Sequence, residues 1–279
     1  MHGIDAGLKA ARAFYIAGVA STSNVIAGRV YGMPVAGTMA HSYVQAHDNE
    51  EAAFRAFARL YPGTVVLVDT YDTLKAVRLV TELAAQFGDE FKIGAVRLDS
   101  GNLEKLSFQA RKILDAAGLQ KVGIFASSGL DEEKIAALVR AGAPIDGFGV
   151  GTAMGVSADR PDIDIVYKLA EYAGKGRIKL SPDKPVLPGR KQIFRSEADG
   201  KATGDTIASA DEKLPGRPLL RTVMRGGRRL PDAAPSLDEI RAYAAREIAA
   251  LPADLRSIES ARPGYPVAVS AELRGRYDR

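Results

Sequence analysis

Two side chains that could bind a phosphorylated ligand end the apolar segment KIGAVRLDSGN, residues 92–102. Its apolar first half predicts a short buried strand. Arg97 and Asp99 are two positions apart, so on a strand their side chains point to the same face. A cation and a carboxylate on one face, beside the turn Ser100–Gly101, suit a ligand with both phosphate and hydroxyl groups. Taken alone, the segment is explained equally well by an Arg–Asp ion pair that closes a turn.

Four further predicted strands, around Val35, Val65, Ile124 and Phe148, also end in polar or glycine residues. These residues are Thr38 with His41, Asp69 with Asp72, Ser127 with Ser128 and Gly129, and Gly151 with Thr152. One polar strand end is ordinary, but five in succession along the chain predict a shared pocket. The turn Ser-Ser-Gly before a predicted helix is a candidate anion site. A capping box of Ser128 and Asp131 would account for the same residues without any ligand.

His41 is the candidate acid, base or nucleophile of this pocket, and it is one of three histidines in the chain. It directly follows a predicted strand end, where a catalytic histidine could reach a bound substrate. A lone histidine is often a surface residue or a hydrogen-bonded core residue instead. The sequence leaves both interpretations open.

The elements that must position these residues alternate between strand and helix over the first 160 residues. Helices are predicted at residues 5–16, 25–31, 49–61, 73–87, 103–117 and 131–141, and the first strand at residues 34–38. The five strands are apolar throughout, as expected for parallel strands covered by helices. Their spacing of about 25–30 residues fits βα units of a barrel or a doubly wound sheet. In barrels, active sites lie at the carboxyl ends of the strands, where the polar residues of this chain are found. We therefore expect an α/β fold for residues 1–160.

A different pattern follows and predicts antiparallel strands at residues 164–172, 176–180, 192–196 and 205–210. Residues 236–251 predict a helix, opened by a capping box of Ser236 and Glu239. We therefore expect residues 161–279 to form part of a smaller β-rich domain with a C-terminal helix and tail.

The composition of the chain excludes cysteine chemistry and argues against a membrane or nucleic-acid partner. The chain has 279 residues, of which 46% are hydrophobic, and it has no cysteine. Disulfides, thiolate chemistry and sulfur-based metal sites are therefore excluded. No apolar stretch reaches the length of about 18 residues that a membrane helix needs, so we expect a cytoplasmic protein. The net charge of +4 and the arginine-rich segment 217–229 are weak signs of a nucleic-acid partner because no aromatic residues interleave the arginines. We expect no nucleic-acid or membrane partner.

The sequence motifs that several common kinds of binding and catalytic site require are absent from this chain. Gly149, Gly151 and Gly155 do not form a dinucleotide-binding fingerprint, and a P-loop is absent. No predicted strand ends in the lysine that a Schiff-base aldolase needs, and the histidines lack metal-ligand spacing. The remaining set of small-residue turns, one arginine, several aspartates and one histidine suits a sugar-phosphate substrate. Mg²⁺ would bridge the oxygens of such a substrate.

Seven stretches of the chain, in family order, resemble the nicotinate phosphoribosyltransferase family. They are STSNVIAGRVYGMPVAGTMAHSYV (21–44), VDTYDT (68–73), VRLDSG (96–101), FASSGLDE (125–132), FGVGT (148–152), VYKLAEY (166–172) and PGRKQIFR (188–195). The resemblance implies the type II phosphoribosyltransferase fold, an irregular α/β barrel joined to a mostly β domain. Residues 1–160 would be the barrel-like phosphoribosyl-binding part.

The resemblance also implies an activity in NAD salvage. Nicotinate and phosphoribosyl pyrophosphate would give nicotinate mononucleotide and pyrophosphate, with Mg²⁺ bound and ATP hydrolysed as a co-substrate. ATP hydrolysis would be coupled through a phosphorylated histidine, which is His41 here. Quinolinate or nicotinamide as the base is the nearby alternative, since the ribose-phosphate loops would look alike.

Roles for the other site residues follow from the same resemblance. Arg97 and Asp99 would hold the phosphoribosyl group and its ribose hydroxyls, and Asp69 would orient His41 or bind the Mg²⁺–pyrophosphate. The loops that bind the substrate would contain Thr38, Ser127, Ser128, Gly129, Gly151 and Thr152. The base pocket would begin at Ser21 and Thr22.

The chain departs from the family at its N-terminus, where family members continue further and carry an arginine-rich stretch. We therefore expect a truncated or separately encoded portion that is inactive or feeble unless a homodimer or another polypeptide completes it. Two alternatives stay open: a non-catalytic binding module that retains the phosphate pocket, and an unrelated barrel lyase or isomerase that acts on a sugar phosphate.

Overall fold

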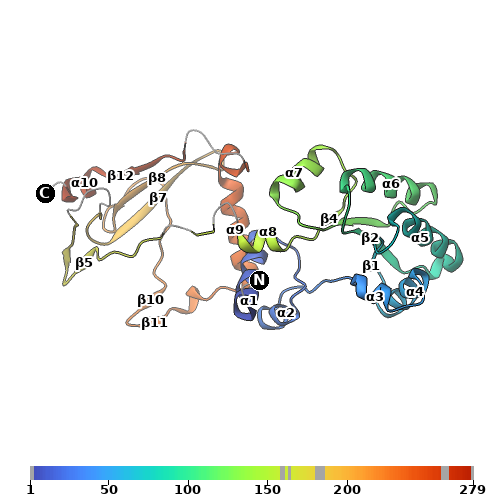
Figure 1. Cartoon of the computed structure of the whole chain (residues 1–279). Coiled ribbons are helices and arrows are strands. Elements are labelled where there is room, and N and C mark those ends of the chain that lie inside the picture. Colours follow the sequence, from blue (N-terminus) through green and yellow to red (C-terminus); the bar gives the residue numbers. More distant parts are fainter. Residues whose placement is uncertain (1–2, 158–160, 163–164, 180–185, 259–263, 278–279) are drawn as a thin grey trace. The chain divides into compact units, whose positions relative to one another are not determined.

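The computed structural model describes residues 3–157, 161–162, 165–179, 186–258 and 264–277. The chain divides into two compact units, one formed by residues 1–11 and 20–161 and the other by residues 12–19 and 162–279. Each unit is described by itself. Figure 1 labels the helices and strands. No helix in the described ranges is both long and apolar enough to cross a membrane.

The first unit contains a four-stranded parallel sheet whose strands follow one another in sequence order (Figure 1). Adjacent parallel strands need a crossover connection, and here each crossover contains a helix. The strands are β1 (Thr64–Leu67), β2 (Ile93–Leu98), β3 (Gly123–Ala126) and β4 (Gly147–Phe148). The crossovers contain α5 (Thr73–Phe87) with the short 3₁₀ helix η1 (Gly88–Glu90), α6 (Leu103–Ala116) and α7 (Glu132–Arg140). A mixed α/β fold is thus established.

Helices also precede and follow this sheet. They are α1 (Ile4–Ala17), which starts in the first unit and ends in the second, α2 (Val25–Tyr31), α3 (His41–Gln45), α4 (Glu50–Leu60) and α8 (Thr152–Val156). The predicted helices at residues 5–16, 25–31, 49–61, 73–87 and 103–117 are confirmed to within two residues at each end.

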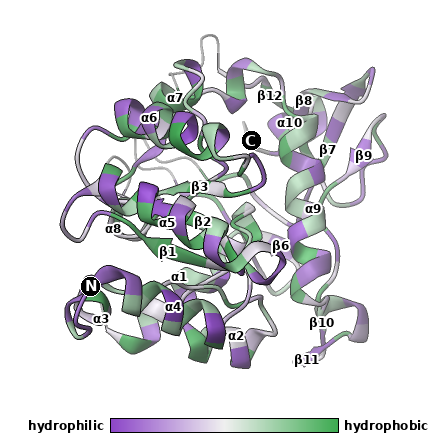
Figure 2. Ribbon diagram, turned by 90° about the vertical axis from the view of Figure 1, so that its right-hand side faces the viewer, coloured by the Kyte–Doolittle hydropathy of each residue, from purple (hydrophilic) through white to green (hydrophobic). Residues whose placement is uncertain are grey.

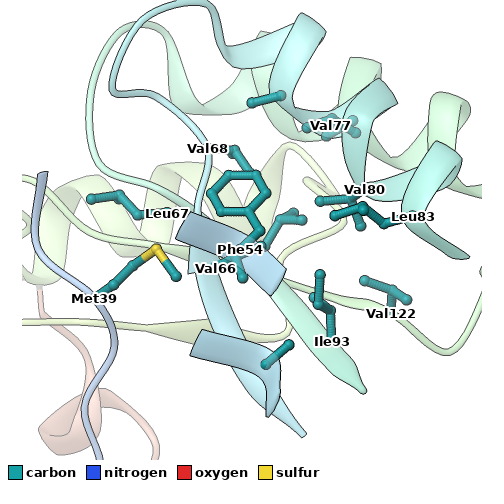
Figure 3. Close-up of a cluster of buried hydrophobic side chains, with 14 of the residues drawn as sticks. Met39, Phe54, Val66, Leu67, Val68, Val77, Val80, Leu83, Ile93 and Val122 are labelled. Carbon is teal, nitrogen blue, oxygen red and sulfur yellow. The ribbon is translucent and has the colours of Figure 1, made fainter. Parts of the chain in front are cut away.

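The hydrophobic core of the first unit lies between the sheet and its helices (Figure 3). Val66, Val68 and Leu67 of the β1 segment are completely buried. Val80 of α5 and Phe54 of α4 are also completely buried and belong to the same cluster. Figure 2 shows the strands of the parallel sheet coloured mostly as hydrophobic, whereas the helices carry both hydrophobic and hydrophilic residues. This core holds the carboxyl ends of the strands at one edge of the sheet.

Side-chain caps fix where the helices begin. Asp72 accepts a hydrogen bond from the backbone N–H of Lys75, and this bond lowers the pKa of the Asp72 carboxyl. Asp131 caps α7 in the same way through the backbone N–H of Lys134, which lowers the pKa of Asp131. The expected cap at Ser128 is therefore wrong. Ser128 has a φ of +91°, whereas an N-cap residue is ordinarily extended, with a negative φ.

The predicted strand at residues 34–38 is also wrong. Only Val35 forms a bridge there, parallel to Thr22, with hydrogen bonds from Thr22 N to Pro34 O and from Ala36 N to Thr22 O. Proline has no N–H to donate, and Gly37 favours irregular backbone, so the segment cannot extend the ladder. The described sheet therefore has four strands rather than five.

The second unit is built around a long antiparallel hairpin in a sheet of order β12-β8-β7-β9. Asp199 and Gly200 close the hairpin, both with positive φ, as a two-residue turn between antiparallel strands requires. The strands are β7 (Lys191–Ala198), β8 (Lys201–Ser209), β9 (Arg217–Pro218) and β12 (Val267–Val269). The predictions at residues 192–196 and 205–210 are confirmed, except that β7 and β8 are longer and β8 ends at Ser209.

Short elements complete the second unit. They are the hairpin strands β5 (Glu171–Tyr172) with β6 (Lys175–Gly176) and β10 (Met224–Arg225) with β11 (Arg228–Arg229), the helices α9 (Leu237–Ala250) and α10 (Ala271–Tyr277), and the 3₁₀ helices η2 (Pro231–Ala233) and η3 (Asp254–Arg256). The predicted capping box of Ser236 and Glu239 at the start of α9 is confirmed.

The predicted strands at residues 164–172 and 176–180 are wrong in extent. Only Glu171–Tyr172 and Lys175–Gly176 pair, as a two-residue ladder. Ile165 and Tyr167 are 79% and 103% exposed, so their apolar side chains have no partner layer among the described residues. An apolar segment without a neighbouring strand has no ladder to join. Residues 163–164 and 180 lie outside the described ranges.

A network of ion pairs ties α9 to the sheet of the second unit. Arg195 on β7 donates two hydrogen bonds of 2.9 Å to Asp205 on β8, the residue directly opposite it. A third bond of 3.0 Å runs from Arg195 to Glu247 on α9. Glu247 also accepts from Arg217 of β9, which lies on the other side of Arg195. Arg195 lowers the pKa of the Asp205 carboxyl through these hydrogen bonds.

We predict that Asp205→Asn will destabilise the second unit by about 3 kcal/mol, because it removes the carboxylate that accepts two of the three side-chain hydrogen bonds of a largely buried guanidinium. Hydrogen exchange of peptides from β7 and β8, followed by mass spectrometry, will measure the loss. Since the pKa of Asp205 is lowered on folding, its contribution is present above the ordinary aspartate pKa of about 4 and disappears as pH falls below it.

The matched control is Asp199→Asn, the same chemical change in the exposed turn of the same hairpin. Hydrogen exchange of peptides from β7 and β8 should be the same in Asp199→Asn as in the wild-type protein at every pH. Equal protection in Asp205→Asn and wild type near neutral pH would contradict the role of the Arg195–Asp205 pair.

Candidate functional site

Asp99 is the centre of the polar cluster at the carboxyl edge of the parallel sheet. It follows β2 directly, and its Oδ2 lies 3.6 Å from Nε2 of His41 and 3.5 Å from Nη2 of Arg97. Its Oδ1 accepts a hydrogen bond from the Ser127 hydroxyl, which follows β3. One carboxylate thus joins residues from two neighbouring strand ends and from the start of α3.

Arg97 keeps donors available for a ligand. Its Nη1 lies 3.4 Å from the Thr38 hydroxyl, a long hydrogen bond, and its Nε is buried and has no partner among the described residues. The side chain is 21% exposed and comes from β2. A partly paired guanidinium with this exposure can bind phosphate or carboxylate oxygens through its remaining N–H groups.

Asp69 fixes the turn after β2. Its Oδ2 accepts a hydrogen bond of 3.1 Å from the backbone N–H of Asp99 and another from the Ser100 hydroxyl. Its Oδ1 is buried and has no partner among the described residues. Asp69 therefore supports Asp99 through the backbone and keeps one oxygen unused.

The prediction from sequence missed Thr70, and it placed Ser100 in a turn beside the site without giving its hydroxyl a contact. Oγ1 of Thr70 lies 3.1 Å from Nδ1 of His41, so this hydroxyl contacts the ring nitrogen that faces away from Asp99. The sequence does place both residues beside predicted site residues, because Thr70 follows Asp69 and Ser100 follows Asp99, each just past the end of a strand. Which of these hydroxyls would reach a site residue could not be read from that position.

The turn after β3 approaches the turn after β4. Backbone bonds run from Ser127 N to Leu98 O, 2.9 Å, and from Gly149 N to Ala126 O, 2.8 Å. A Cβ added to Gly149 would lie 3.3 Å from Cβ of Ser127, so a side chain at position 149 would crowd this turn. Ser128 and Gly129 are exposed and have φ values of +91° and +57°, and α7 begins just beyond them. A polar turn at a helix start suits an anion.

Four residues predicted for the site make no bond to the groups around Asp99. In the described ranges, no hydrogen bond or ion pair joins Ser21, Thr22, Gly151 or Thr152 to His41, Arg97, Asp99 or Ser127. Thr22 forms the bridge to Val35, and its hydroxyl accepts from the backbone of Asn24. Gly151 is the N-cap of α8, and Thr152 is the first residue of that helix. Their substrate-binding roles stay predictions.

The donor set fits a magnesium ion shared with a substrate rather than one caged by protein. Within the described residues, no group of three histidine or acidic side chains is placed to hold a metal. Asp69 nevertheless accepts a hydrogen bond from the backbone N–H of Asp99, and its other carboxylate oxygen has no partner among the described residues. Mg²⁺ is commonly held by one or two carboxylates together with substrate phosphates.

Comparison with known families matches two families in succession along the chain. Residues 6–196 match the Nicotinate phosphoribosyltransferase (NAPRTase) family, and residues 215–275 match the Nicotinate phosphoribosyltransferase C-terminal domain. This chain belongs to the nicotinate phosphoribosyltransferase family. The Asp99 cluster and the turn at Ser127–Gly129 lie inside the first match.

Curated relatives are longer than this chain. A nicotinate phosphoribosyltransferase of Mycobacterium tuberculosis is 55% identical over 278 residues, which cover 100% of this chain and 60% of the relative. The Bacillus subtilis enzyme is 42% identical over 229 residues, 79% of this chain and 47% of the relative. The chain thus spans about 60% of the length of the first of these curated relatives.

Solved structures of the family share the fold. The crystal structure of human nicotinic acid phosphoribosyltransferase matches 100% of this chain and 68% of its own, with a TM-score of 0.82 and 27% identity. A structure from Pyrococcus furiosus described as a nicotinate-nucleotide pyrophosphorylase matches 85% of this chain and 60% of its own, with a TM-score of 0.70 and 29% identity.

We predict that Ser128→Gly will be more stable than Ser128→Ala by about 1 kcal/mol, because only glycine adopts a φ of +91° without strain. Both variants remove the hydroxyl, so their difference isolates the backbone. Urea unfolding followed by circular dichroism will measure it. The control is the pair Ser42→Gly and Ser42→Ala within α3, where alanine should be the more stable residue. Equal stability of the two Ser128 variants would argue against strain at this turn.

Proposed function

We propose that this chain carries the phosphoribosyl-binding and catalytic part of a nicotinate phosphoribosyltransferase. Nicotinate and phosphoribosyl pyrophosphate would give nicotinate mononucleotide and pyrophosphate, a step of NAD salvage. The observation that carries the proposal is the gathering of His41, Arg97 and Ser127 around the Asp99 carboxylate, within a chain of this family.

The displacement at C1 of the ribose requires little covalent chemistry from the protein. The pyridine nitrogen of nicotinate forms a bond to C1 while the bond from C1 to the pyrophosphate oxygen breaks, and pyrophosphate leaves with the electron pair. Positive charge develops on the ribose in the transition state. Preorganised charges and hydrogen bonds therefore supply most of the catalysis.

The site residues divide these tasks. Asp99 would hold the ribose hydroxyls and Arg97 the phosphate oxygens, for which the 21% exposure of the Arg97 side chain gives access. The turn at Ser127, Ser128 and Gly129 would bind the 5′-phosphate with Gly151 and Thr152, and Thr38 would support Arg97. Ser21 and Thr22 would begin the base pocket.

Mg²⁺ and ATP complete the proposed chemistry. Mg²⁺, held by Asp69 with the pyrophosphate oxygens, would neutralise charge on the leaving group. A ring nitrogen of His41 would accept the γ-phosphoryl group of ATP as ADP leaves, and water would later release phosphate from the ring. This cycle would couple ATP hydrolysis to product formation. The 41% exposure of the His41 side chain supports such access.

The finer architecture belongs to the same proposal. Residues 1–160 would form an incomplete, irregular α/β barrel of the type II phosphoribosyltransferase kind, and residues 161–279 part of a smaller β-rich domain with the C-terminal helix and tail. Four sequential parallel strands and the TM-score of 0.82 to the human structure support this. A cytoplasmic location stays a prediction from the sequence.

A partner-dependent fragment is the second candidate function, favoured by a group of exposed apolar side chains in the second unit. Ile165, Tyr167 and Leu169 are 79%, 103% and 63% exposed, a degree unusual for apolar side chains in succession. A second copy of the chain or a polypeptide that corresponds to the rest of the relatives would cover them. The isolated chain would then retain the phosphate pocket but turn over slowly.

We predict that His41→Ala will abolish ATP hydrolysis coupled to nicotinate mononucleotide formation, because it removes the imidazole that would accept the phosphoryl group. Product and pyrophosphate release are measured after nicotinate, phosphoribosyl pyrophosphate and Mg²⁺ are added, with and without ATP. His47→Ala is the matched control, since Nδ1 of His47 bonds the Tyr43 carbonyl at 2.8 Å and lies outside the cluster.

Full coupling in His41→Ala would contradict the histidine's role. No product from the isolated chain, but product after the missing portion of a relative is added, would favour the partner-dependent fragment. No product under either condition would leave neither candidate tenable.

A further inference from the structure

Thr70 has a hydroxyl whose only described contact is His41. The residue lies just past β1, and its Oγ1 is 3.1 Å from Nδ1 of the imidazole. The resemblance to the family did not single it out, and the chemistry proposed for the site does not use it. A side chain that touches only a proposed phosphoryl acceptor can act through that acceptor.

The two nitrogens of His41 face groups of different character. Nε2 lies 3.6 Å from the carboxylate of Asp99, which accepts from Ser127 and faces Arg97. A carboxylate beside a guanidinium is an acceptor, so the nitrogen that faces it carries the proton. The hydroxyl of Thr70 can donate, and it then bonds the lone pair left on Nδ1.

We propose that Thr70 is a positioning residue that holds His41 as its Nε2–H tautomer. The Thr70 hydroxyl donates to Nδ1, and Asp99 receives the Nε2–H edge of the ring. The pair fixes both the rotation of the imidazole and the nitrogen that bears the lone pair. The importance of this arrangement for turnover rests on the proposed function, but the tautomer itself does not.

His47 provides an internal contrast. Its Nδ1 lies 2.8 Å from the backbone carbonyl of Tyr43, which can only accept, so His47 must carry its proton on Nδ1. The two histidines are therefore expected to hold opposite tautomers within one unit of the chain. Which nitrogen is protonated follows from the hydrogen-bond partner, and spectroscopy can observe it directly.

The test is nuclear magnetic resonance of the full chain with ¹⁵N-labelled histidine rings at about pH 8, well above the ordinary histidine pKa. The chain has three histidines, and His41→Gln and His47→Gln assign their signals. We expect the Nε2–H pattern for His41 and the Nδ1–H pattern for His47. An Nδ1–H pattern, or protons on both nitrogens of His41, would overturn the proposal.

Thr70→Val removes the hydroxyl at nearly constant shape, and Thr70→Ser restores it. We expect the valine variant to lose the single tautomer of His41 and the serine variant to keep it. Thr81→Val in α5 is the matched control, because the Thr81 hydroxyl bonds only the Arg78 carbonyl of its own helix. A His41 spectrum unchanged in Thr70→Val would refute the role of Thr70.

Kinetics separate this proposal from the proposed function. In the phosphoryl transfer, Thr70 would release the lone pair of Nδ1, Nδ1 would attack the γ-phosphorus of ATP, and ADP would leave with the electron pair. Because Thr70→Val no longer fixes that lone pair on Nδ1, it should lower kcat for ATP-coupled turnover about 2- to 12-fold with active protein, the equivalent of one hydrogen bond. KM for ATP should stay unchanged, and Thr70→Ser should rescue kcat. If the tautomers are as expected but no nicotinate mononucleotide forms, the proposed function fails and the positioning by Thr70 stands.

Discussion

The shared use of one carboxylate, that of Asp99, is the interaction on which the candidate site depends. Its two oxygens face an arginine, a histidine and a serine, which come from β2, from α3 and from the turn after β3. Asp69 holds the backbone N–H of Asp99, so the position of the carboxylate is set from the neighbouring strand end as well. Groups that would repel or drift apart in water are thereby held within contact distance, before any substrate is present.

The parallel sheet makes this convergence possible. Parallel strands present their carboxyl ends at one edge, and the core behind them, which includes Val66 and Ile124, is fully buried and therefore rigid. Aspartate caps at Asp72 and Asp131 start α5 and α7 close behind the strands. At this edge of the sheet, Asp72 and Asp131 therefore stabilise the fold as helix caps and are not part of the candidate site. The pKa values of these two carboxyls are lowered because each carboxylate accepts a hydrogen bond from a backbone N–H group.

In the second unit the charged side chains pair with one another. The Arg195–Asp205 pair and Glu247 satisfy one another and bind β7, β8 and α9 together, so they have little capacity left for a ligand. In the first unit, Arg97 Nε and Asp69 Oδ1 are buried and unpaired within the described ranges. Unsatisfied polar atoms are costly in a folded protein, and their presence at one strand edge supports a role in binding.

The sequence by itself determined the local elements: the helices around Lys75 and Lys105, the buried strands and the capping box at Ser236 follow from periodicity and caps. It also identified Arg97, Asp99 and His41, because residue type and strand-end position are local properties. Only the tertiary structure decided that Thr70 contacts His41 and that residues 34–38 do not join the sheet. Those outcomes depend on which distant groups meet in space, and local pattern carries no information about such contacts.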